Sequence, residues 1–237
     1  MNLEVLASVL NLKKKVLRSS KMIDFLSPNI IIEVTCFVIA IAFLHNDVST
    51  TWKSMILFML VICITEIAGI ITKRTINGNN WVYNIYLMPE AGFVSITFGH
   101  LISKYTKSKI IVLPGLALLF VLYLYEIYKH GIYNFNTLTT TIMSLLFICY
   151  GLYYYYLLIK DEQYINLKTY APFWWVSGTL FFYFGSIVSN LNFSVLSSDY
   201  LQLFSFRHAI YILLNIVLYS FWSYSFLCRY RQRNSIL

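Results

Sequence analysis

The sequence predicts an all-α protein: a polytopic integral membrane bundle of seven transmembrane helices, preceded by a basic amphipathic surface helix. Hydrophobic residues make up 59% of the chain and charged residues only 12%, whereas soluble domains carry about 25% charged residues. The mean hydropathy is +0.66. So few charges exclude a soluble enzyme of ordinary type, a coiled coil and a disordered chain. Seven separate apolar stretches, close in length to a bilayer core of about 30 Å, complete the prediction.

The first 27 residues predict a helix on the membrane surface. Leucines recur there at helical spacing, and basic residues crowd the second half. Such a helix is expected to rest on anionic lipid headgroups, and a frayed basic tail is the alternative. The stretch lacks the features of a cleaved secretory signal, so we expect it in the mature protein. The basic residues are Lys13, Lys14, Lys15, Arg18 and Lys21.

Residues 28–228 form the predicted transmembrane domain, and residues 229–237 a basic carboxyl-terminal tail. Each apolar segment should be helical, because backbone polar groups have no water partner in lipid. The segments are Pro28 to Leu44, Trp52 to Ile71, Tyr83 to Ile102, Ile110 to Tyr128, Thr137 to Leu158, Pro172 to Asn190 and His208 to Cys228.

Charged or turn-forming residues mark the segment ends in chain order. Lys73-Arg74 ends the second segment, and Lys104 to Lys109 separates the third from the fourth. Asn134-Phe135-Asn136 precedes the fifth segment, which ends at Lys160-Asp161-Glu162. The sixth segment carries small residues, including Gly178, that favour close contact with another helix.

The orientation depends on the basic residues in the loops. With the carboxyl terminus inside, the cytoplasmic side holds nine Lys and Arg residues. The other side holds four without the amino-terminal helix and nine with it. We expect the carboxyl terminus to be cytoplasmic. A re-entrant first segment is a further alternative, since that segment is only 17 residues long and contains Glu33.

Three carboxylates within the predicted spans are the most informative residues. An ionisable group in a spanning helix costs roughly 2.5 to 3.5 kcal/mol on insertion scales. Glu33 lies ~8 Å from the start of its segment, Glu66 ~8 Å from the end of the next, and Glu90 ~10 Å from the start of the third. Because consecutive helices run in opposite directions, all three are expected at similar depth below one membrane face.

Further polar residues lie near the same face. Asn215 is ~10 Å into the last segment, and Asn84, Asn190 and His208 lie at the rim. The pattern predicts a polar cavity that opens to this face and binds a ligand or a cation. The alternative is that each carboxylate is protonated and bonded to a neighbouring helix.

Pro89 is expected to break the third predicted helix. It lacks a backbone donor, so it would leave a carbonyl free for a ligand or cation beside the neighbouring carboxylate. A plain kink is the alternative. No catalytic residue, metal site or cofactor is predicted. The cysteines Cys36, Cys63, Cys149 and Cys228 lie in apolar runs without a CxxC pair, so no disulfide or zinc site is indicated.

Several short motifs follow one another from the second segment onward. They are Thr65-Glu66, Asn84-Ile85-Tyr86, Pro89-Glu90, Phe173-Trp174-Trp175-Val176-Ser177-Gly178, Phe182-Tyr183-Phe184-Gly185, His208 and Asn215. In these motifs the chain resembles a group of small uncharacterised bacterial seven-helix inner-membrane proteins. The resemblance implies seven helices, a place in the bacterial inner (plasma) membrane, and added weight for Glu66, Glu90 and Asn215. It implies no substrate.

Other seven-helix classes fit the residues less well. Microbial rhodopsins need a Lys in the last span, which has none, and hydrolases related to alkaline ceramidases need an HxxxH zinc motif where this chain has only His208. The chain has a weaker similarity to nicotinamide riboside transporters, which carry WxxW in the sixth span; here Trp174 and Trp175 are adjacent.

The sequence favours a non-enzymatic receptor or sensor-like module whose change of packing is read by a cytoplasmic partner protein. The alternative is a small-solute or cation-coupled transporter, and an intramembrane hydrolase ranks third. Polar groups become scarce in the halves of the segments away from the carboxylates, which tips the balance toward a receptor. Nucleic-acid binding is not expected, because the net charge of +8 lies at membrane-flanking positions.

Overall fold

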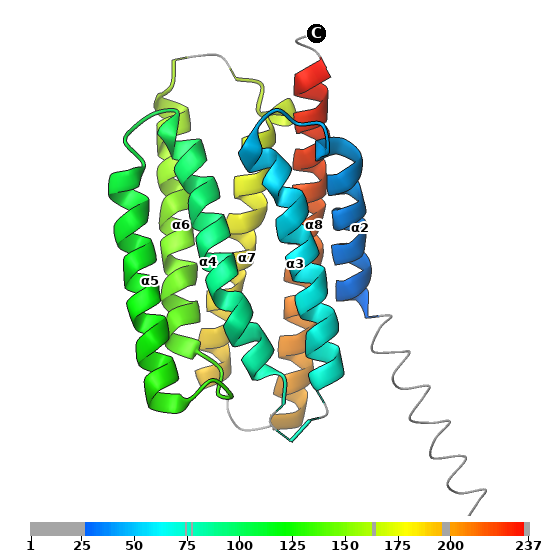
Figure 1. Cartoon of the computed structure of the whole chain (residues 1–237), viewed down its shortest axis with the longest axis vertical. Coiled ribbons are helices and arrows are strands. Elements are labelled where there is room, and N and C mark those ends of the chain that lie inside the picture. Colours follow the sequence, from blue (N-terminus) through cyan, green and yellow to red (C-terminus); the bar gives the residue numbers. More distant parts are fainter. Residues whose placement is uncertain (1–26, 74, 77, 163–164, 196–199, 235–237) are drawn as a thin grey trace, which may run out of the picture.

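The structure is a computed structural model that describes residues 27–73, 75–76, 78–162, 165–195 and 200–234, without the side chains of residues 190–208. Every regular element in these ranges is helical, as predicted (Figure 1). The predicted surface helix lies outside the described residues, apart from Ser27. The elements are α2 (Pro28–Leu44), α3 (Thr50–Thr72), α4 (Asn80–Ser103), α5 (Lys109–His130), α6 (Thr137–Lys160), the short 3-10 turn η1 (Leu167–Thr169), α7 (Ala171–Val195) and α8 (Tyr200–Asn234).

Each of the seven apolar segments has become one helix. Six of these helices, α3 to α8, are long and apolar enough to cross a membrane, so the chain is a multi-pass membrane protein. The first, α2, is a shorter apolar helix of 17 residues, about 25 Å long at 1.5 Å per residue. It runs continuously beside α3 and α8 and does not turn back on itself (Figure 1).

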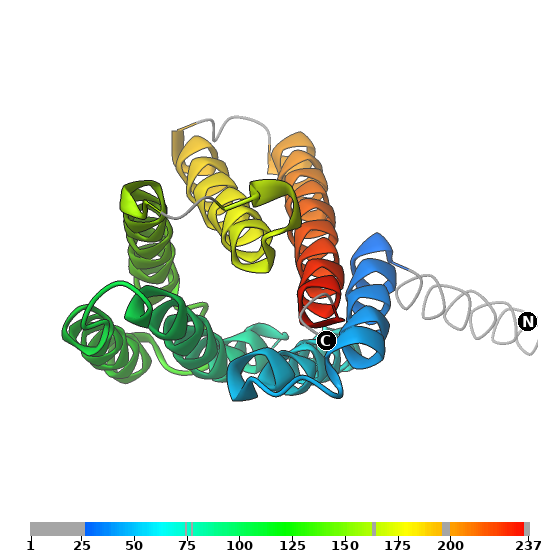
Figure 2. The ribbon, with the colours of Figure 1, turned by 90° about the horizontal axis from the view of Figure 1, so that it is seen from above.

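Six of the seven α-helices in the described residues form a closed ring, and the other one lies outside it. α2 packs against α3 and α8, α3 against α4, α4 against α6, α6 against α7, and α7 against α8. α5 packs on the outside of this ring, against α4 and α6 (Figure 2). The contact between α2 and α8 therefore joins the first and the last described helix and closes the ring.

The ring has two ends, which we call the amino-terminal and the carboxyl-terminal face. α2 begins at the amino-terminal face, where the α3–α4 and α5–α6 loops also lie. α8 ends at the carboxyl-terminal face, together with the α2–α3, α4–α5 and α6–α7 loops (Figure 1).

The close contact between α7 and α8 depends on a glycine of α7. A Cβ atom added at Gly178 would lie 2.8 Å from the Cβ of Phe221 and 3.3 Å from the carbonyl oxygen of Leu218. Only a residue without a side chain lets the two backbones approach this far, as the small residues of the sixth segment predicted.

The turn between α5 and α6 is held by a buried carboxylate that the sequence reading did not single out. Gly131, with φ of 75°, ends α5 in a conformation that other residues rarely adopt. Glu126 in the last turns of α5 accepts hydrogen bonds from the backbone N–H groups of Leu138 and Thr139 at 2.9 and 2.7 Å, and from the Thr139 hydroxyl at 2.6 Å. It thereby satisfies donors that the first turn of α6 would otherwise leave unpaired.

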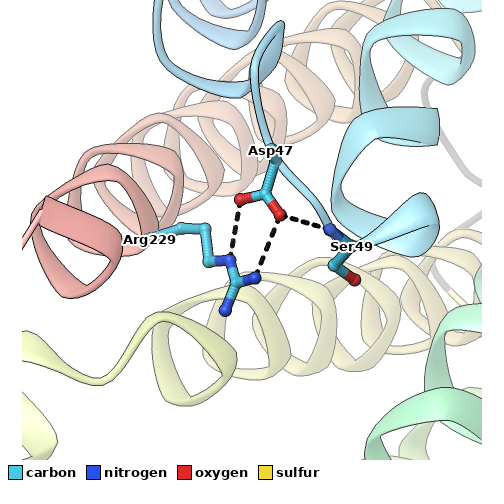
Figure 3. Close-up of polar contacts among 3 residues, drawn as sticks. All are labelled: Asp47, Ser49 and Arg229. Atoms are coloured by element: carbon cyan, nitrogen blue, oxygen red, sulfur yellow. Dashed lines mark hydrogen bonds and ion pairs between the residues drawn. The ribbon is translucent and has the colours of Figure 1, made fainter. Parts of the chain in front are cut away.

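A buried ion pair ties the α2–α3 loop to α8 on the carboxyl-terminal face (Figure 3). Arg229 donates to both oxygens of Asp47, from Nε at 2.8 Å and from Nη2 at 3.0 Å, and the N–H of Ser49 donates to the same carboxylate at 2.8 Å. Burial opposes the ionisation of Asp47, but these hydrogen bonds and the charge of Arg229 outweigh it and lower the pKa of Asp47.

The basic residues after Cys228 belong to the last helix. Residues 229–234 are not a separate tail but continue α8, which runs to Asn234. The reason is physical: Arg229 lies where Asp47 can bind it, and basic residues near the carboxyl end of a helix interact favourably with the helix dipole. Arg229 is therefore a structural residue rather than a free basic group.

Candidate functional site

The ring of six helices encloses a cavity of about 430 Å³. Side chains from α2, α3, α4, α6, α7 and α8 and from the α5–α6 loop line it, and α5 contributes none of its lining. The cavity lies in the half of the ring toward the amino-terminal face, since it reaches Phe135 in the α5–α6 loop. The lining residues are Glu33, Phe58, Ile62, Thr65, Glu66, Tyr83, Tyr86, Leu87, Glu90, Phe135, Thr140, Met143, Ser144, Phe182, Tyr183, Ser186, Tyr211, Asn215, Leu218, Tyr219 and Trp222.

The structure brings the three carboxylates of the spanning helices together in this cavity. Glu33 comes from α2, Glu66 from α3 and Glu90 from α4, and all three line it. The carboxylates of Glu33 and Glu66 lie close enough to interact electrostatically. Among the described lining residues there is no Lys, Arg or His, so three acidic groups share one cavity without a basic side chain.

Tyrosine side chains reach across the cavity to the carboxylates. The hydroxyl of Tyr183 on α7 donates to Oε1 of Glu90 at 2.7 Å, and that of Tyr83 on α4 donates to Oε2 of Glu66 at 3.4 Å. The latter contact is long and therefore weak. Each bond joins a carboxylate to a tyrosine of a different helix.

Glu33 is the carboxylate that the protein leaves least satisfied. Its side chain is 2% exposed, and its Oε2 has no hydrogen-bond partner. Tyr219 of α8 lies close enough to interact with the carboxylate. The comparison with Glu126 is direct, because Glu126 is also buried but receives three hydrogen bonds from α6. Buried carboxylate oxygens without a donor are costly and uncommon, so the free oxygen of Glu33 points to a missing donor.

An aromatic layer separates the cavity from the carboxyl-terminal face. Phe58 and Trp222 line the cavity, and Trp222 stacks on Trp175 with ring centroids 5.8 Å apart. Behind them Phe98 packs on both Trp175 and Phe147, at 5.3 and 6.3 Å between centroids. Trp175, Phe98 and Phe147 have no exposed surface. The polar lining ends at this layer.

Of the further polar residues predicted near the same face as the carboxylates, some line the cavity and others do not. Asn215 lines the cavity from α8. Asn84 does not line it: its amide donates to the carbonyl oxygens of Ile132 and Asn134 at 2.7 and 2.6 Å, and its oxygen accepts from the N–H of Asn136. Asn84 therefore fixes the α5–α6 loop, because that loop ends against α4. The side chains of two further predicted rim residues, Asn190 and His208, lie outside the described residues.

The predicted helix break at Pro89 is absent. α4 runs unbroken from Asn80 to Ser103, with Pro89 inside it. Pro89 is exposed on the outer side of the helix and does not line the cavity. A spanning helix can contain a proline when neighbouring helices pack against it on both sides of the proline. α4 packs against α3, α5 and α6.

The tyrosines are the cavity residues that the sequence reading missed. Tyr211, Asn215 and Tyr219 follow each other at intervals of four on α8, so they share one helix face. Likewise Tyr86 lies four residues before Glu90 on α4. A tyrosine four residues from a polar residue of the same helix was the sequence pattern that could have indicated these cavity residues.

Metal-ligating side chains and similarity to known proteins both bear on what the cavity binds. Within the described part of the chain, no group of three or more His, Cys, Asp or Glu residues could hold a metal ion. The cavity combines three hydrogen-bond-accepting carboxylates with aromatic walls, a combination suited to a small molecule. No protein-family model matches the chain, and no curated protein and no solved structure is significantly similar to it.

Proposed function

We propose that the protein is a non-enzymatic, receptor-like membrane module that binds a small solute in the cavity described above. The single observation that carries this proposal is the pairing of a polar cavity with packed aromatic side chains on its carboxyl-terminal side. A solute enters from the amino-terminal face and binds the carboxylates. It bridges helices that already meet there, so binding changes the packing of α8 against α2 and α7, and a partner protein reads that change.

The topology that we propose follows from the same ring. α2 crosses the membrane as the first of seven spans, because it packs along α3 and α8 and supplies a cavity carboxylate. The carboxyl-terminal face is cytoplasmic, as the count of Lys and Arg in the loops without the amino-terminal helix favours. The membrane is the bacterial inner membrane, as the resemblance implies. The amino-terminal basic residues then bind anionic headgroups on the opposite side. The partner contacts the cytoplasmic loops and the end of α8.

A transporter is the competing function, and the aromatic layer separates the two. Alternating access requires that the binding residues become reachable from both faces. For that, the stack of Trp222, Trp175 and Phe98 would have to open. A receptor needs no such opening.

Accessibility of single cysteines tests the proposal without knowledge of the solute. Thr65→Cys on α3 and Thr140→Cys on α6 place thiols on two different helices of the cavity lining. Oriented vesicles are treated from either side with a membrane-impermeant thiosulfonate, and the parent chain controls for its own cysteines. We expect labelling from the amino-terminal face alone. Labelling from both faces would favour the transporter, and protection from both would remove the solute-binding cavity altogether.

A further inference from the structure

The ligand class can be read from the cavity's charge balance. Three carboxylates line it, and no basic side chain does so among the described lining residues. In a medium of low dielectric constant a carboxylate binds a cation far more strongly than in water. A negatively charged solute would lie beside these acidic side chains with no basic side chain among the described lining residues to neutralise it, so the cavity disfavours anions.

The free oxygen of Glu33 specifies more than charge. Oε2 of Glu33 is buried and receives no hydrogen bond, although Tyr219 interacts with the same carboxylate. An ionised carboxylate oxygen accepts hydrogen bonds and donates none. A cation that carries N–H groups supplies a donor, and a quaternary ammonium does not.

Aromatic side chains in the same cavity suit an apolar body. Phe58, Tyr86 and Trp222 line it, with Phe58 and Tyr86 stacked at 6.4 Å between centroids and 16° between planes. Phe58 and Trp222 are 4% and 3% exposed, so each is buried but for a small accessible part of its ring. Aromatic faces attract cations and pack against flat or apolar groups.

An inorganic cation fits these observations less well. A metal ion needs several oxygen ligands converging at 2.0 to 2.6 Å, and no such group of acids is present in the described residues. Two of the three carboxylates each accept a hydrogen bond from a tyrosine instead. A volume of about 430 Å³ is also that of a small organic ligand rather than of a bare ion.

We infer that the cavity binds an organic ammonium ion with N–H donors, a primary or secondary amine whose positive end lies at Glu33 and Glu66 and whose apolar body packs on Phe58 and Trp222. This inference rests on the proposed function, since it names the class of solute that the cavity takes.

Four probes with the same aromatic body test the inference on the full-length protein in mild detergent at constant ionic strength. They are 2-phenylethylamine, its trimethylammonium analogue, the neutral 2-phenylethanol and the anionic 3-phenylpropionate. Isothermal calorimetry and thermal unfolding measure binding. We expect the amine to bind at least about tenfold more tightly than the alcohol and the carboxylate. The trimethylammonium ion should bind more weakly than the amine, because it cannot donate to Glu33.

Variants locate the interaction. Glu33→Gln should weaken amine binding about tenfold or more, and Glu90→Gln provides a second cavity variant in case the first does not fold. Glu162→Gln is the matched control, because Glu162 is an exposed carboxylate outside the cavity, and it should leave binding unchanged.

Three outcomes would overturn the inference. Failure of the amine to bind at millimolar concentration would do so, and so would equal binding of the alcohol or of the trimethylammonium ion. Stabilisation by Na⁺ or Mg²⁺ that depends on Glu33, without any effect of the amine, would assign the site to an inorganic cation. None of these outcomes touches the proposed function, which stands or falls on the cysteine labelling from the two faces.

Discussion

Separating Asp47 from Arg229 should cost far more than breaking any exposed ion pair of the protein. The Asp47 side chain is fully buried and Arg229 is 29% exposed, and two direct hydrogen bonds of 2.8 and 3.0 Å join them. Breaking a buried pair typically costs about 3 to 5 kcal/mol, because one charge stays buried without its partner. Since Arg229 keeps some access to solvent, we expect Asp47→Ala to cost about 3 kcal/mol, at the lower end.

A double-mutant cycle isolates the pair. The free energy of unfolding is measured for the parent, Asp47→Ala, Arg229→Ala and the double variant, by titration with sodium dodecyl sulfate and far-UV circular dichroism. We expect a coupling energy of about 2 kcal/mol. Lys104 and Asp161 are the matched control, because their charged atoms are 3.8 Å apart and the Lys104 side chain is 51% exposed. Their coupling should stay below about 1 kcal/mol. Equal coupling in both pairs would refute the argument.

The same pair gives a pH dependence with a definite sign. The pKa of Asp47 is lower in the folded protein than its ordinary value of 3.8. The pair's contribution to stability is therefore fully present above that ordinary value, and it is lost as the pH falls through the lower, folded value. Between pH 5 and pH 3 the parent should lose more stability than Asp47→Asn. A parallel decline in both proteins would contradict this.

Three further variants test the packing and the loop, each by the same unfolding titration. Gly178→Ala should lower the free energy of unfolding by about 1 to 3 kcal/mol, because the added Cβ would press on Phe221. Gly92→Ala is the control: nothing lies within 4 Å of its added Cβ, so it should be neutral or stabilising by up to about 1 kcal/mol. A similar cost at both glycines would refute the close approach of α7 and α8. Glu126→Ala should cost about 2 kcal/mol by leaving donors of α6 unpaired, and no loss would show that water replaces the cap. Asn84→Ala should cost about 1 to 3 kcal/mol and raise hydrogen exchange in the α5–α6 loop, while unchanged exchange there would show that the loop is held by other contacts.

The sequence predicted the helices well because lipid leaves the backbone few options. A run of apolar residues must close its own hydrogen bonds, and its length follows from the bilayer, so seven segments became seven helices. The rise per residue and the alternating direction of the helices also predicted one depth for Glu33, Glu66 and Glu90. The cavity that they line is consistent with that reasoning.

Which side of each helix faces the bundle was harder to predict than how deep each residue lies in the membrane. In a soluble helix the polar face shows which side is outside, but here lipid-facing and buried sides are both apolar. Nothing in the sequence placed α5 outside the ring, or Pro89 on the outer side of α4. Tyr183 reaches Glu90 over 93 positions of sequence, and Arg229 reaches Asp47 over 182. Contacts of that range depend on the order of helices, which local patterns do not encode.

The closure of the ring has a consequence for biosynthesis. Its final joint is made by the first and last described helices, and α8 leaves the ribosome long after α2. At 5 to 20 residues per second, the 182 residues between Asp47 and Arg229 correspond to a delay on the order of 10 to 40 seconds. During that interval Glu33 and Asp47 lack their contacts with α8, because α8 has not yet been synthesised. A chain halted before α8 would therefore leave the ring open, with Glu33 lacking its contact with Tyr219 and Asp47 lacking its hydrogen bonds to Arg229.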